Sequence, residues 1–553
     1  MSHPNGPRTG RPPVLAPRGM VSTPHYLASA SGLEALRRGG SAVDAAIAAN
    51  ATLCVVYPHM AGLGGDGFWL IAGPNTGGVQ ALDASGPAAR KATRDYYRKH
   101  GQTDQIPARG PLAALTTPGV VDGWRAAHER HGRLPWASLF ADAIEYARNG
   151  IAVTRSLADW LAADESILRQ FPDTARIFLP TGKAQREGAR LAQTELAHTF
   201  EQLAASGARA AFYEGSIAQR ICKGLAPAGS PLSPDDFAGY HARWVKPIST
   251  SYRGYDVVQM PPSTQGFAAL QILNLLEGFD VAAWGDGTAD YYHHMLEAVK
   301  VAFADRDEWL TDPEFVNIPL EQLLSKDYAA ARRKLINAKQ ALAGEKVEPG
   351  LRYGTRFDHR NPDGDTVYFC ASDASGLVVS KIQSIYHDFG AAIMGGDTGI
   401  IMQNRGSFFS LDDNHPNRLE PGKRTFHTII PAMMLKDGEP VLAYGTMGGE
   451  GQPQTQAAML TRLVDFGYDV QQAIEAPRWL MGRTWGMASR DLWLESSISD
   501  EAARELRLRG QPVKMVGRWD GTLGHAQAIR IDRKSGLFEG GADPRGDGAA
   551  MGY

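Results

Sequence analysis

A threonine at the start of a β-rich hairpin is the residue of this chain best suited to nucleophilic chemistry. Thr366 follows a loose polar run and opens an alternating segment that reaches Ala371, turns at residues 373–376 and returns through Ile382. Two β-rich runs around an Asp/Ser/Gly turn predict a hairpin. If the chain is cut after Asp365, the new α-amine, with a pKa of ~7.7–8.0, can serve as base for the weakly nucleophilic hydroxyl. The stretch alone favours an ordinary threonine at a strand start, and the rest of the chain is needed to decide.

Length and charge exclude several classes of function. The chain has 553 residues, enough for two to four average domains or one large two-part α/β body. Its formal net charge of −3 gives no basic field for nucleic acid or for an anionic membrane. No apolar run of about 18 residues and no signal-peptide core are present. We therefore expect a cytoplasmic protein with neither a nucleic-acid nor a membrane partner.

The cysteines predict no metal site. Cys54, Cys222 and Cys370 all lie in apolar surroundings, without CxxC or Cys/His spacing. A zinc site and a disulfide framework are therefore not expected. Cys370 lies close to Thr366, but four residues into a strand, where a packed thiol is the better interpretation. We expect neither a metal nor another cofactor.

Composition divides the chain into three parts. Residues 1–18 are rich in Pro, Gly and Arg and are expected to be a flexible N-terminus. Residues 19–365 are mainly helical and end in a charged, Gly/Pro-dotted stretch, 339–365, which is typical of an exposed, cleavable linker. Residues 366–553 alternate short strands with helices.

Three loops invite a functional interpretation. Gly62, Gly64 and Gly67 match G-x-G-x-x-G formally, but a helix precedes them and a strand follows, so a dinucleotide site is rejected. These glycines are expected to let the backbone pass close to another element. The polar loop 261–266 is of a kind that borders pockets. The glycine loop 445–451, ahead of a predicted helix, could stabilise an oxyanion through its N–H groups or could be a plain turn.

Many motifs in one order resemble the γ-glutamyltransferase family of N-terminal-nucleophile hydrolases. The resemblance runs nearly end to end through Gly39-Gly40-Ser41-Ala42, Gly62-Leu63-Gly64-Gly65, Thr117-Pro118-Gly119, Met260-Pro261-Pro262, Gly395-Gly396-Asp397-Thr398 and Asp543-Pro544-Arg545. It implies an α+β fold, an αββα sandwich. It also implies a precursor that cuts itself between Asp365 and Thr366. The products would be a large chain, 1–365, and a small chain, 366–553, that stay associated, with a dimer of such pairs left open.

The resemblance also implies catalytic roles. Thr366 stands in the place of the nucleophile. Ser384 stands where the family has a threonine whose hydroxyl supports the nucleophile. Gly448 and Gly449 stand where the family forms its oxyanion hole.

The residues that would recognise a γ-glutamyl group are replaced. Ser85 stands where the family has an arginine for the α-carboxylate, and Phe408 replaces the acid that holds the α-amine. Tyr386 replaces an asparagine, and His427-Thr428 replace paired serines. Loss of the contacts to both the α-carboxylate and the α-amine should cost several powers of ten in affinity for a γ-glutamyl substrate. The chemistry is kept, but the γ-glutamyl recognition is not.

A different substrate is therefore expected. Arg405, with His427 and Tyr386, could bind a small anionic acyl group, because an arginine fork suits a carboxylate. In these motifs the chain most resembles the oxamate amidohydrolase and cephalosporin-acylase-like members of the family. Two structural alternatives stay open: Arg405 could pair with Asp412 or Asp413, and His427 could be a satisfied buried histidine.

We expect a self-processing threonine amidohydrolase that hydrolyses a small anionic, oxamate-like amide through an acyl-enzyme. One alternative is a γ-glutamyltransferase or glutathione hydrolase, against which Ser85 and Phe408 argue. A second is a cephalosporin-acylase-like amidase. A third is a non-enzymatic scaffold, against which the retained Thr366 and the Gly448–Gly449 pair argue.

Overall fold

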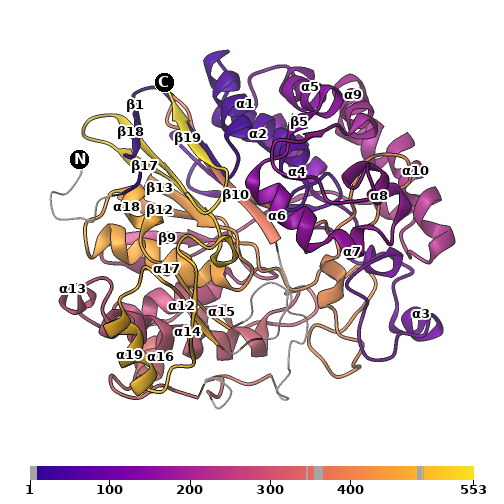
Figure 1. The fold of residues 1–553 in the computed structure, drawn as a ribbon. Coiled ribbons are helices and arrows are strands. Elements are labelled where there is room, and N and C mark those ends of the chain that lie inside the picture. Colours follow the sequence, from indigo (N-terminus) through magenta and orange to yellow (C-terminus); the bar gives the residue numbers. More distant parts are fainter. Residues whose placement is uncertain (1–8, 344–346, 354–364, 483–488, 490) are drawn as a thin grey trace.

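Two facing β-sheets form the centre of the molecule, which a computed structural model describes over residues 9–343, 347–353, 365–482, 489 and 491–553. Within these residues each of the two sheets has seven strands, and helices cover both outer surfaces (Figure 1). The first sheet has the order β1 (Val14–Ala16), β18 (Leu537–Ala542), β17 (Ala526–Asp532), β13 (Glu439–Thr446), β12 (Ala432–Lys436), β9 (Tyr255–Gln259) and β8 (Ile248–Tyr252). The second has the order β19 (Ala549–Gly552), β2 (Met20–Thr23), β10 (Asp365–Ser372), β11 (Val378–Tyr386), β3 (Asp66–Ala72), β4 (Gln80–Ala84) and β7 (Arg243–Val245).

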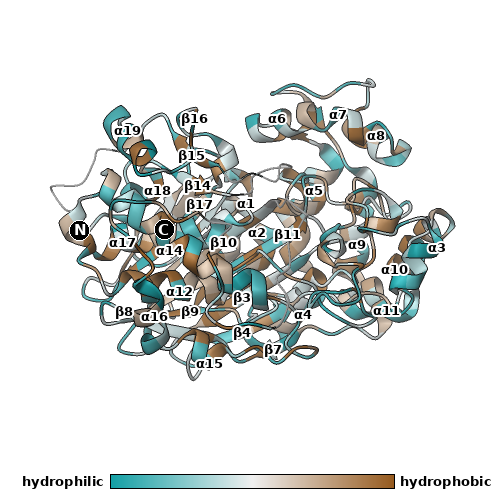
Figure 2. Cartoon of the chain, turned by 90° about the horizontal axis from the view of Figure 1, so that it is seen from below, coloured by the Kyte–Doolittle hydropathy of each residue, from teal (hydrophilic) through white to brown (hydrophobic). Residues whose placement is uncertain are grey.

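One group of helices covers each sheet. The second sheet is covered by α1 (Tyr26–Arg37), α2 (Ala42–Val56), α4 (Val120–His131), α5 (Ala141–Asn149) and α9 (Thr194–Ala208). The first is covered by α12 (Gly266–Leu276), α14 (Ala289–Trp309), α17 (Gly451–Val464) and α18 (Val470–Glu475). In Figure 2, α4, α5 and α9 lie on one side of β10 and β3, and α12, α14, α17 and α18 lie on the other. The predicted αββα sandwich is confirmed.

Shorter helices and strands lie outside the two main sheets and the helices that cover them. They are α3 (Arg94–Lys99), α6 (Arg155–Ala163), α7 (Glu165–Leu168), α8 (Pro172–Phe178), α10 (Ser216–Leu225), α11 (Pro234–Ala238), α13 (Val281–Trp284), α15 (Leu320–Leu323), α16 (Lys326–Arg333) and α19 (Asp500–Leu508), with β5 (Ile151–Ala152), β6 (Arg190–Leu191), β14 (Trp479–Met481), β15 (Leu492–Glu495) and β16 (Val513–Val516).

The predicted hairpin around Thr366 is confirmed. β10 and β11 pair antiparallel, and Gly376 in their turn has a φ of 84°. Val367 and Phe369 lie in the core shared with the helices, whereas Tyr368 and Cys370 lie in the core between the two sheets. Because successive side chains of a strand point to opposite faces, Thr366 points into the space between the sheets.

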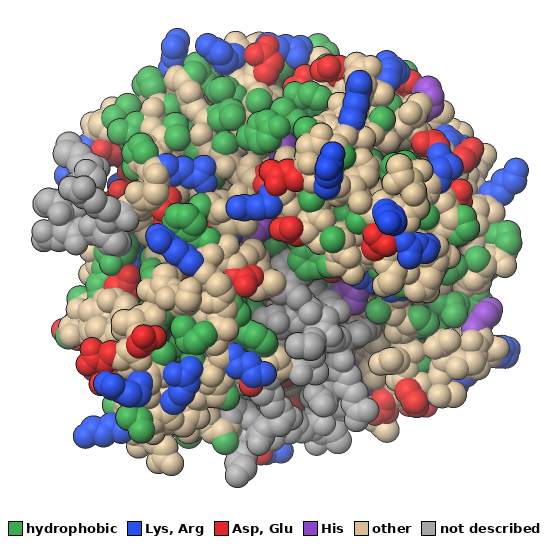
Figure 3. All heavy atoms as spheres, in the orientation of Figure 1, with side chains coloured by type: hydrophobic (Ala, Val, Ile, Leu, Met, Phe, Trp, Pro, Cys, Tyr) green, Lys and Arg blue, Asp and Glu red, His purple; other side chains and the backbone are tan. Residues whose placement is uncertain are grey.

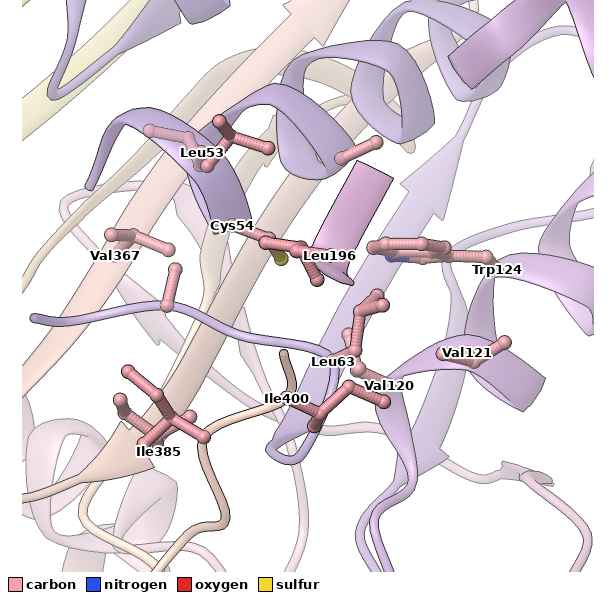
Figure 4. Packing of buried hydrophobic residues seen from close by; sticks show 14 of the residues in the cluster. Leu53, Cys54, Leu63, Val120, Val121, Trp124, Leu196, Val367, Ile385 and Ile400 are labelled. Atoms are coloured by element: carbon pink, nitrogen blue, oxygen red, sulfur yellow. The ribbon is translucent and has the colours of Figure 1, made fainter. Parts of the chain in front are cut away.

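The helix-side core of this sheet explains the apolar run that precedes the first glycine loop. Every residue of α2 is buried, and Ser41 begins the helix with a capping box to Asp44. Figure 4 shows Leu53 and Cys54 of α2 in the same cluster as Val367 of β10 and Ile385 of β11. Burial raises the pKa of the Cys54 thiol to about 12, so this cysteine is a packed apolar side chain.

Two expectations about irregular segments need correction. Residues 9–18 are not a free N-terminus, because β1 pairs with β18 and the Arg11 guanidinium donates to the carbonyl of Ala542 (2.8 Å). The described part of the expected linker is also attached: Val347 is buried, and the amide of Gly350 donates to the Asp305 carboxylate (2.8 Å). Residues 344–346 and 354–364 of that linker lie outside the described residues.

The outer surface agrees with the charge balance of the sequence. Lys and Arg side chains are interspersed with Asp and Glu over the face in Figure 3. Within the described ranges, no helix is both long and apolar enough to cross a membrane.

The glycine loop before β3 allows the close backbone contacts that were expected. A Cβ on Gly64 would lie 2.1 Å from the carbonyl oxygen of Ile401, and one on Gly65 would lie 2.3 Å from that of Ser384. A Cβ on Gly62 would meet nothing closer than a methyl group of Ile385 at 3.4 Å. The loop thus presses the start of β3 against the end of β11.

Replacement of Gly65 should therefore harm both stability and activity. We expect Gly65→Ala to lower Tm by an amount equivalent to ~1–3 kcal/mol, the usual cost of overpacking, and to lower turnover because Ser384 is displaced. Gly62→Ala is the matched control and should change stability by less than ~0.5 kcal/mol. Thermal unfolding of both variants is the measurement, and equal Tm values would contradict the close approach.

Candidate active site

Thr366 lies at an irregular step of the hairpin. The register places Asp365 opposite Tyr386 and Val367 opposite Gln383, so Ser384 and Ile385 together oppose the single Thr366. Such a bulge re-aims side chains and is common beside active sites. The Thr366 hydroxyl is fully buried and has no hydrogen-bond partner among the described residues. The hydroxyl is therefore not engaged by any other group of the described residues.

Ser384 lies next to this threonine on β11. Its Oγ accepts a hydrogen bond from the amide of Tyr386 (2.8 Å) and another from Nη2 of Arg405 (2.7 Å). Tyr386 ends the strand in a left-handed conformation, with a φ of 79°. The serine hydroxyl is thus fixed from two sides, one of them a cation.

Arg405 begins a short 3-10 turn, η6 (Arg405–Phe408), and is fully buried. Its Nη1 donates to Oγ1 of Thr428 (3.2 Å), and its guanidinium lies over the Tyr386 ring, 4.3 Å from the centroid. No carboxylate lies within ion-pair distance of it in the described part of the chain, although the charge of Asp66 acts on it, and its Nε has no hydrogen-bond partner there. Burial lowers the pKa of Arg405 to about 10, so the group remains a cation at neutral pH.

The proposed structural pairing of Arg405 is wrong. Asp413 instead binds Arg94 (2.5 Å) and Arg98 (3.2 Å) at the surface. Asp412 accepts a hydrogen bond from the amide of Asn414 (2.9 Å). Arg405 is therefore an interior cation that is not held by either of these acids.

His427 precedes β12 and faces the second sheet across the space between the layers. Its ring meets Phe68 edge-on, with centroids 5.1 Å apart, and neither ring nitrogen has a hydrogen-bond partner among the described residues. The interpretation as a satisfied buried histidine is therefore wrong. Burial and the charge of Arg405 hold the pKa of His427 well below its usual value, so the ring is neutral.

The glycine loop joins β13 to α17, with Gly448 and Gly449 at φ values of 113° and 53°. β13 packs on β10: a Cβ on Gly445 would lie 2.5 Å from the Tyr368 ring. Tyr368 is two residues beyond Thr366 and on the same face, so the loop and Thr366 lie at the same end of the two sheets. The loop also lies at the N-terminus of α17, where backbone N–H groups favour negative charge.

Two residues that support this loop were not recognised from the sequence. Nε2 of Gln265 donates to the carbonyls of Thr428 (2.6 Å) and Gly449 (3.0 Å). Its Oε1 accepts from Nη1 of Arg306 (3.0 Å). Gln265 belongs to the polar loop predicted to border a pocket, which was the available signal.

Ser85 does not reach this group of residues. Its hydroxyl donates to Oδ1 of Asp83 (2.5 Å), and its amide donates to the same oxygen (2.9 Å). Among the described residues it makes no hydrogen bond to Thr366 or Arg405. The expected substrate contact of Ser85 is replaced by a local turn around Asp83.

Aromatic rings occupy the place of the missing acid. Phe408 packs with tilted rings against Tyr386 (4.4 Å between centroids) and Phe426 (4.7 Å). Such a wall offers no carboxylate to a substrate ammonium group. Within the described residues no cluster of His, Cys, Asp and Glu could hold a metal ion. Cys370 is buried, and burial raises the pKa of its thiol above the usual range.

Comparison with known proteins agrees with this geometry. The family model described as Gamma-glutamyltranspeptidase matches residues 28–553. The chain is 46% identical over 539 residues to the Glutathione hydrolase-like YwrD proenzyme of Bacillus subtilis (strain 168), across 98% of this chain and 99% of the relative. It is 43% identical over 545 residues to the Oxamate amidohydrolase proenzyme of Klebsiella pneumoniae subsp. pneumoniae, with the same coverage.

Solved structures give the same result. The crystal structure of cephalosporin acylase from Bacillus halodurans superposes with a TM-score of 0.90 at 36% identity, over 100% of this chain and 98% of that chain. The fold is that of the N-terminal-nucleophile amide hydrolases. The chain belongs to the gamma-glutamyltranspeptidase family.

Proposed function

We propose that this enzyme is a self-processing threonine amidohydrolase that hydrolyses a small anionic amide of the oxamate type. The observation that carries the proposal is Arg405, a buried cation without a carboxylate partner among the described residues, hydrogen-bonded to Ser384 beside Thr366. A guanidinium in this position can bind a substrate carboxylate with two parallel hydrogen bonds. Oxamate carries its carboxylate directly beside the amide to be cleaved.

Processing uses the same hydroxyl as turnover. Oγ1 of Thr366 attacks the carbonyl carbon of Asp365, and the peptide bond is exchanged for an ester that water hydrolyses. The products are a large chain, 1–365, and a small chain, 366–553, with a free α-amine on Thr366. Both the Bacillus and the Klebsiella relatives are named proenzymes, which supports this step.

Turnover then follows the chemistry of an N-terminal nucleophile. The neutral α-amine takes the proton from Oγ1 of Thr366 as this oxygen attacks the amide carbon. The N–H groups of Gly448 and Gly449 hold the tetrahedral oxyanion, at the helix N-terminus where negative charge is favoured. The amine passes its proton to the departing nitrogen, which leaves as ammonia. Water then cleaves the acyl ester, and oxalate is released from oxamate.

The surroundings of Arg405 favour this substrate over a γ-glutamyl amide. A γ-glutamyl group needs a carboxylate for its ammonium, and Phe408 supplies an aromatic ring instead. The hydroxyl of Ser85 is engaged by Asp83 and offers no cation for the α-carboxylate. The oxamate amidohydrolase relative, at 43% identity, supports the same choice.

Substitution of Thr366 tests whether one hydroxyl performs both processing and turnover. Thr366→Ala should remain one uncut chain without amidase activity, because the same hydroxyl performs both reactions. Thr366→Ser, which keeps a hydroxyl, is the matched control and should be cut and active, though more slowly. Intact-mass spectrometry of the purified proteins is the measurement. A Thr366→Ala protein that still yields the 1–365 fragment would rule out Thr366 as the nucleophile.

Substitution of Gln265 tests the support of the oxyanion loop. Gln265→Leu removes both hydrogen bonds to the loop carbonyls and should lower kcat by ~10- to 100-fold, since small displacements of catalytic groups are that costly. The control is Gln271→Leu, because Gln271 is equally buried in α12 but donates to Asp305 and Leu323. It should affect stability without a comparable loss of kcat. Equal kcat values for both variants would contradict the role of Gln265.

A pair of isosteric substrates isolates the contribution of Arg405. Arg405→Met should lower kcat/KM for oxamate by ~30- to 1,000-fold, corresponding to ~2–4 kcal/mol for a lost bidentate contact. Oxamide replaces the carboxylate by a neutral amide, so its kcat/KM should fall by less than ~10-fold. Denaturing gels of the variant should still show two chains. Equal losses for oxamate and oxamide would make Arg405 a structural residue.

A further inference from the structure

A second buried charged group acts electrostatically on Arg405 and takes no part in the steps of processing or turnover. Asp66 is the first residue of β3, is fully buried and lies opposite Ser384 in the register with β11. Phe68, two residues further on, lies in the core between the sheets. Because side chains alternate along a strand, Asp66 points into the same space as Thr366 and Ser384.

The two oxygens of Asp66 have different surroundings. Oδ1 accepts hydrogen bonds from the amides of Gly86 and Gly119, both 3.1 Å away. Oδ2 has no hydrogen-bond partner among the described residues and lies 3.9 Å from Nε2 of His427, which has none either. The carboxyl group is therefore held firmly by one oxygen, while the other is directed at the space between the sheets.

Binding of an anionic substrate would leave the buried site with an excess of negative charge. The Arg405 cation and the Asp66 carboxylate balance each other across Ser384, which Arg405 contacts at 2.7 Å. A substrate carboxylate bound to Arg405 would leave two buried anions and one cation. An uncompensated buried charge is costly, and such groups commonly neutralise by a change of protonation.

We propose that Asp66 takes up one proton when the anionic substrate binds to Arg405, and that its carboxyl group thereby makes recognition of the anion dependent on pH. This inference rests on the proposed oxamate-type substrate. The proton comes from solvent and converts the carboxylate into a neutral carboxylic acid. Its O–H can then donate from the Oδ2 side, where the neutral ring of His427 is 3.9 Å away.

The titration behaviour of the site is consistent with this assignment. Burial raises the pKa of Asp66 to about 7, against the opposing effects of the nearby Gln403 side chain, the hydrogen bonds from Gly86 and Gly119 and the charge of Arg405. The group is therefore poised to change protonation near neutral pH. Its protonated form accepts the anion, so affinity for an anionic substrate is present below this pKa and is lost as the pH rises through it.

Apart from the α-amine of a processed Thr366, the other ionisable groups around Asp66 keep their charge through this range. Arg405, on η6, titrates at about 10, and His427, ahead of β12, stays neutral because its pKa is lowered. The phenols of Tyr213 and Tyr240 feel the Asp66 charge, and burial raises the pKa of both well above the usual value. The α-amine of a processed Thr366 titrates near ~7.7–8.0, but it is required equally for charged and neutral amides.

The test compares oxamate with neutral oxamide from pH 6 to pH 9. The ionisation of the α-amine affects kcat/KM for both substrates equally, because kcat/KM reports ionisations of the free enzyme. Its effect therefore cancels in the ratio of the two kcat/KM values. In the wild-type enzyme this ratio should fall about tenfold per pH unit above the Asp66 pKa. In Asp66→Asn, whose amide oxygen can keep the bonds from Gly86 and Gly119, the ratio should stay within about twofold.

A matched control addresses non-specific effects of removing a buried acid. Asp469 caps α18, and burial raises its pKa as well. Asp469→Asn keeps a capping side chain and should retain the wild-type fall of the ratio.

The outcomes separate this inference from the proposed function. Turnover of oxamate with a ratio that is constant from pH 6 to pH 9 in the wild type would overturn the role of Asp66 alone. A fall that persists in Asp66→Asn would do the same. Absence of any oxamate turnover at every pH would overturn the proposed substrate instead. If Asp66→Asn fails to fold or to be cut, the wild-type ratio still decides, since only a falling ratio is compatible with the proposal.

Discussion

The guanidinium of Arg405 is removed from water without an acidic side chain at ion-pair distance in the described residues, and the surrounding site is built around that charge. Burial of an ion in a protein interior costs several kcal/mol, which hydrogen bonds must offset. Here the hydroxyls of Ser384 and Thr428 accept from the two Nη atoms, and the Tyr386 ring covers the face of the group. These contacts are neutral, and the charge of Asp66 acts on the guanidinium without an ion-pair contact. An incoming carboxylate would therefore be the acidic group in direct contact with Arg405.

The αββα sandwich brings this cation to Thr366, the proposed nucleophile. Thr366, Ser384 and Asp66 occupy neighbouring strands of one sheet and share the face toward the other sheet. The other sheet contributes His427 and the loop with Gly449 from the ends of β12 and β13. Segments far apart in the sequence thus meet at one end of the sandwich, and Gln265 ties the two loops of the first sheet together. The reacting groups lie on rigid strands, which is what precise positioning requires.

Local patterns were sufficient to predict part of this arrangement. The alternation after Thr366 predicted the hairpin, and the order of motifs predicted the sandwich. The contacts of Ser85 were not predictable, because a serine two residues after Asp83 can equally form a local turn or face a pocket. The partners of Asp66 were not predictable either, because an acid among glycines at the start of a strand does not reveal which distant groups it will meet. The pairing of Arg405 depends on contacts distant in sequence, which spacing alone does not specify.

The most direct test of the central claim is ammonia release by the purified, processed enzyme from a panel of amides at equal concentration. The panel contains oxamate, its neutral analogue oxamide and γ-glutamyl amides, so it varies the charge next to the scissile bond and the presence of an ammonium group. The account predicts fastest release from oxamate, slower release from oxamide and little from the γ-glutamyl amides. Rapid turnover of γ-glutamyl amides with none of oxamate would contradict it, because the Arg405 cation would then not select the substrate.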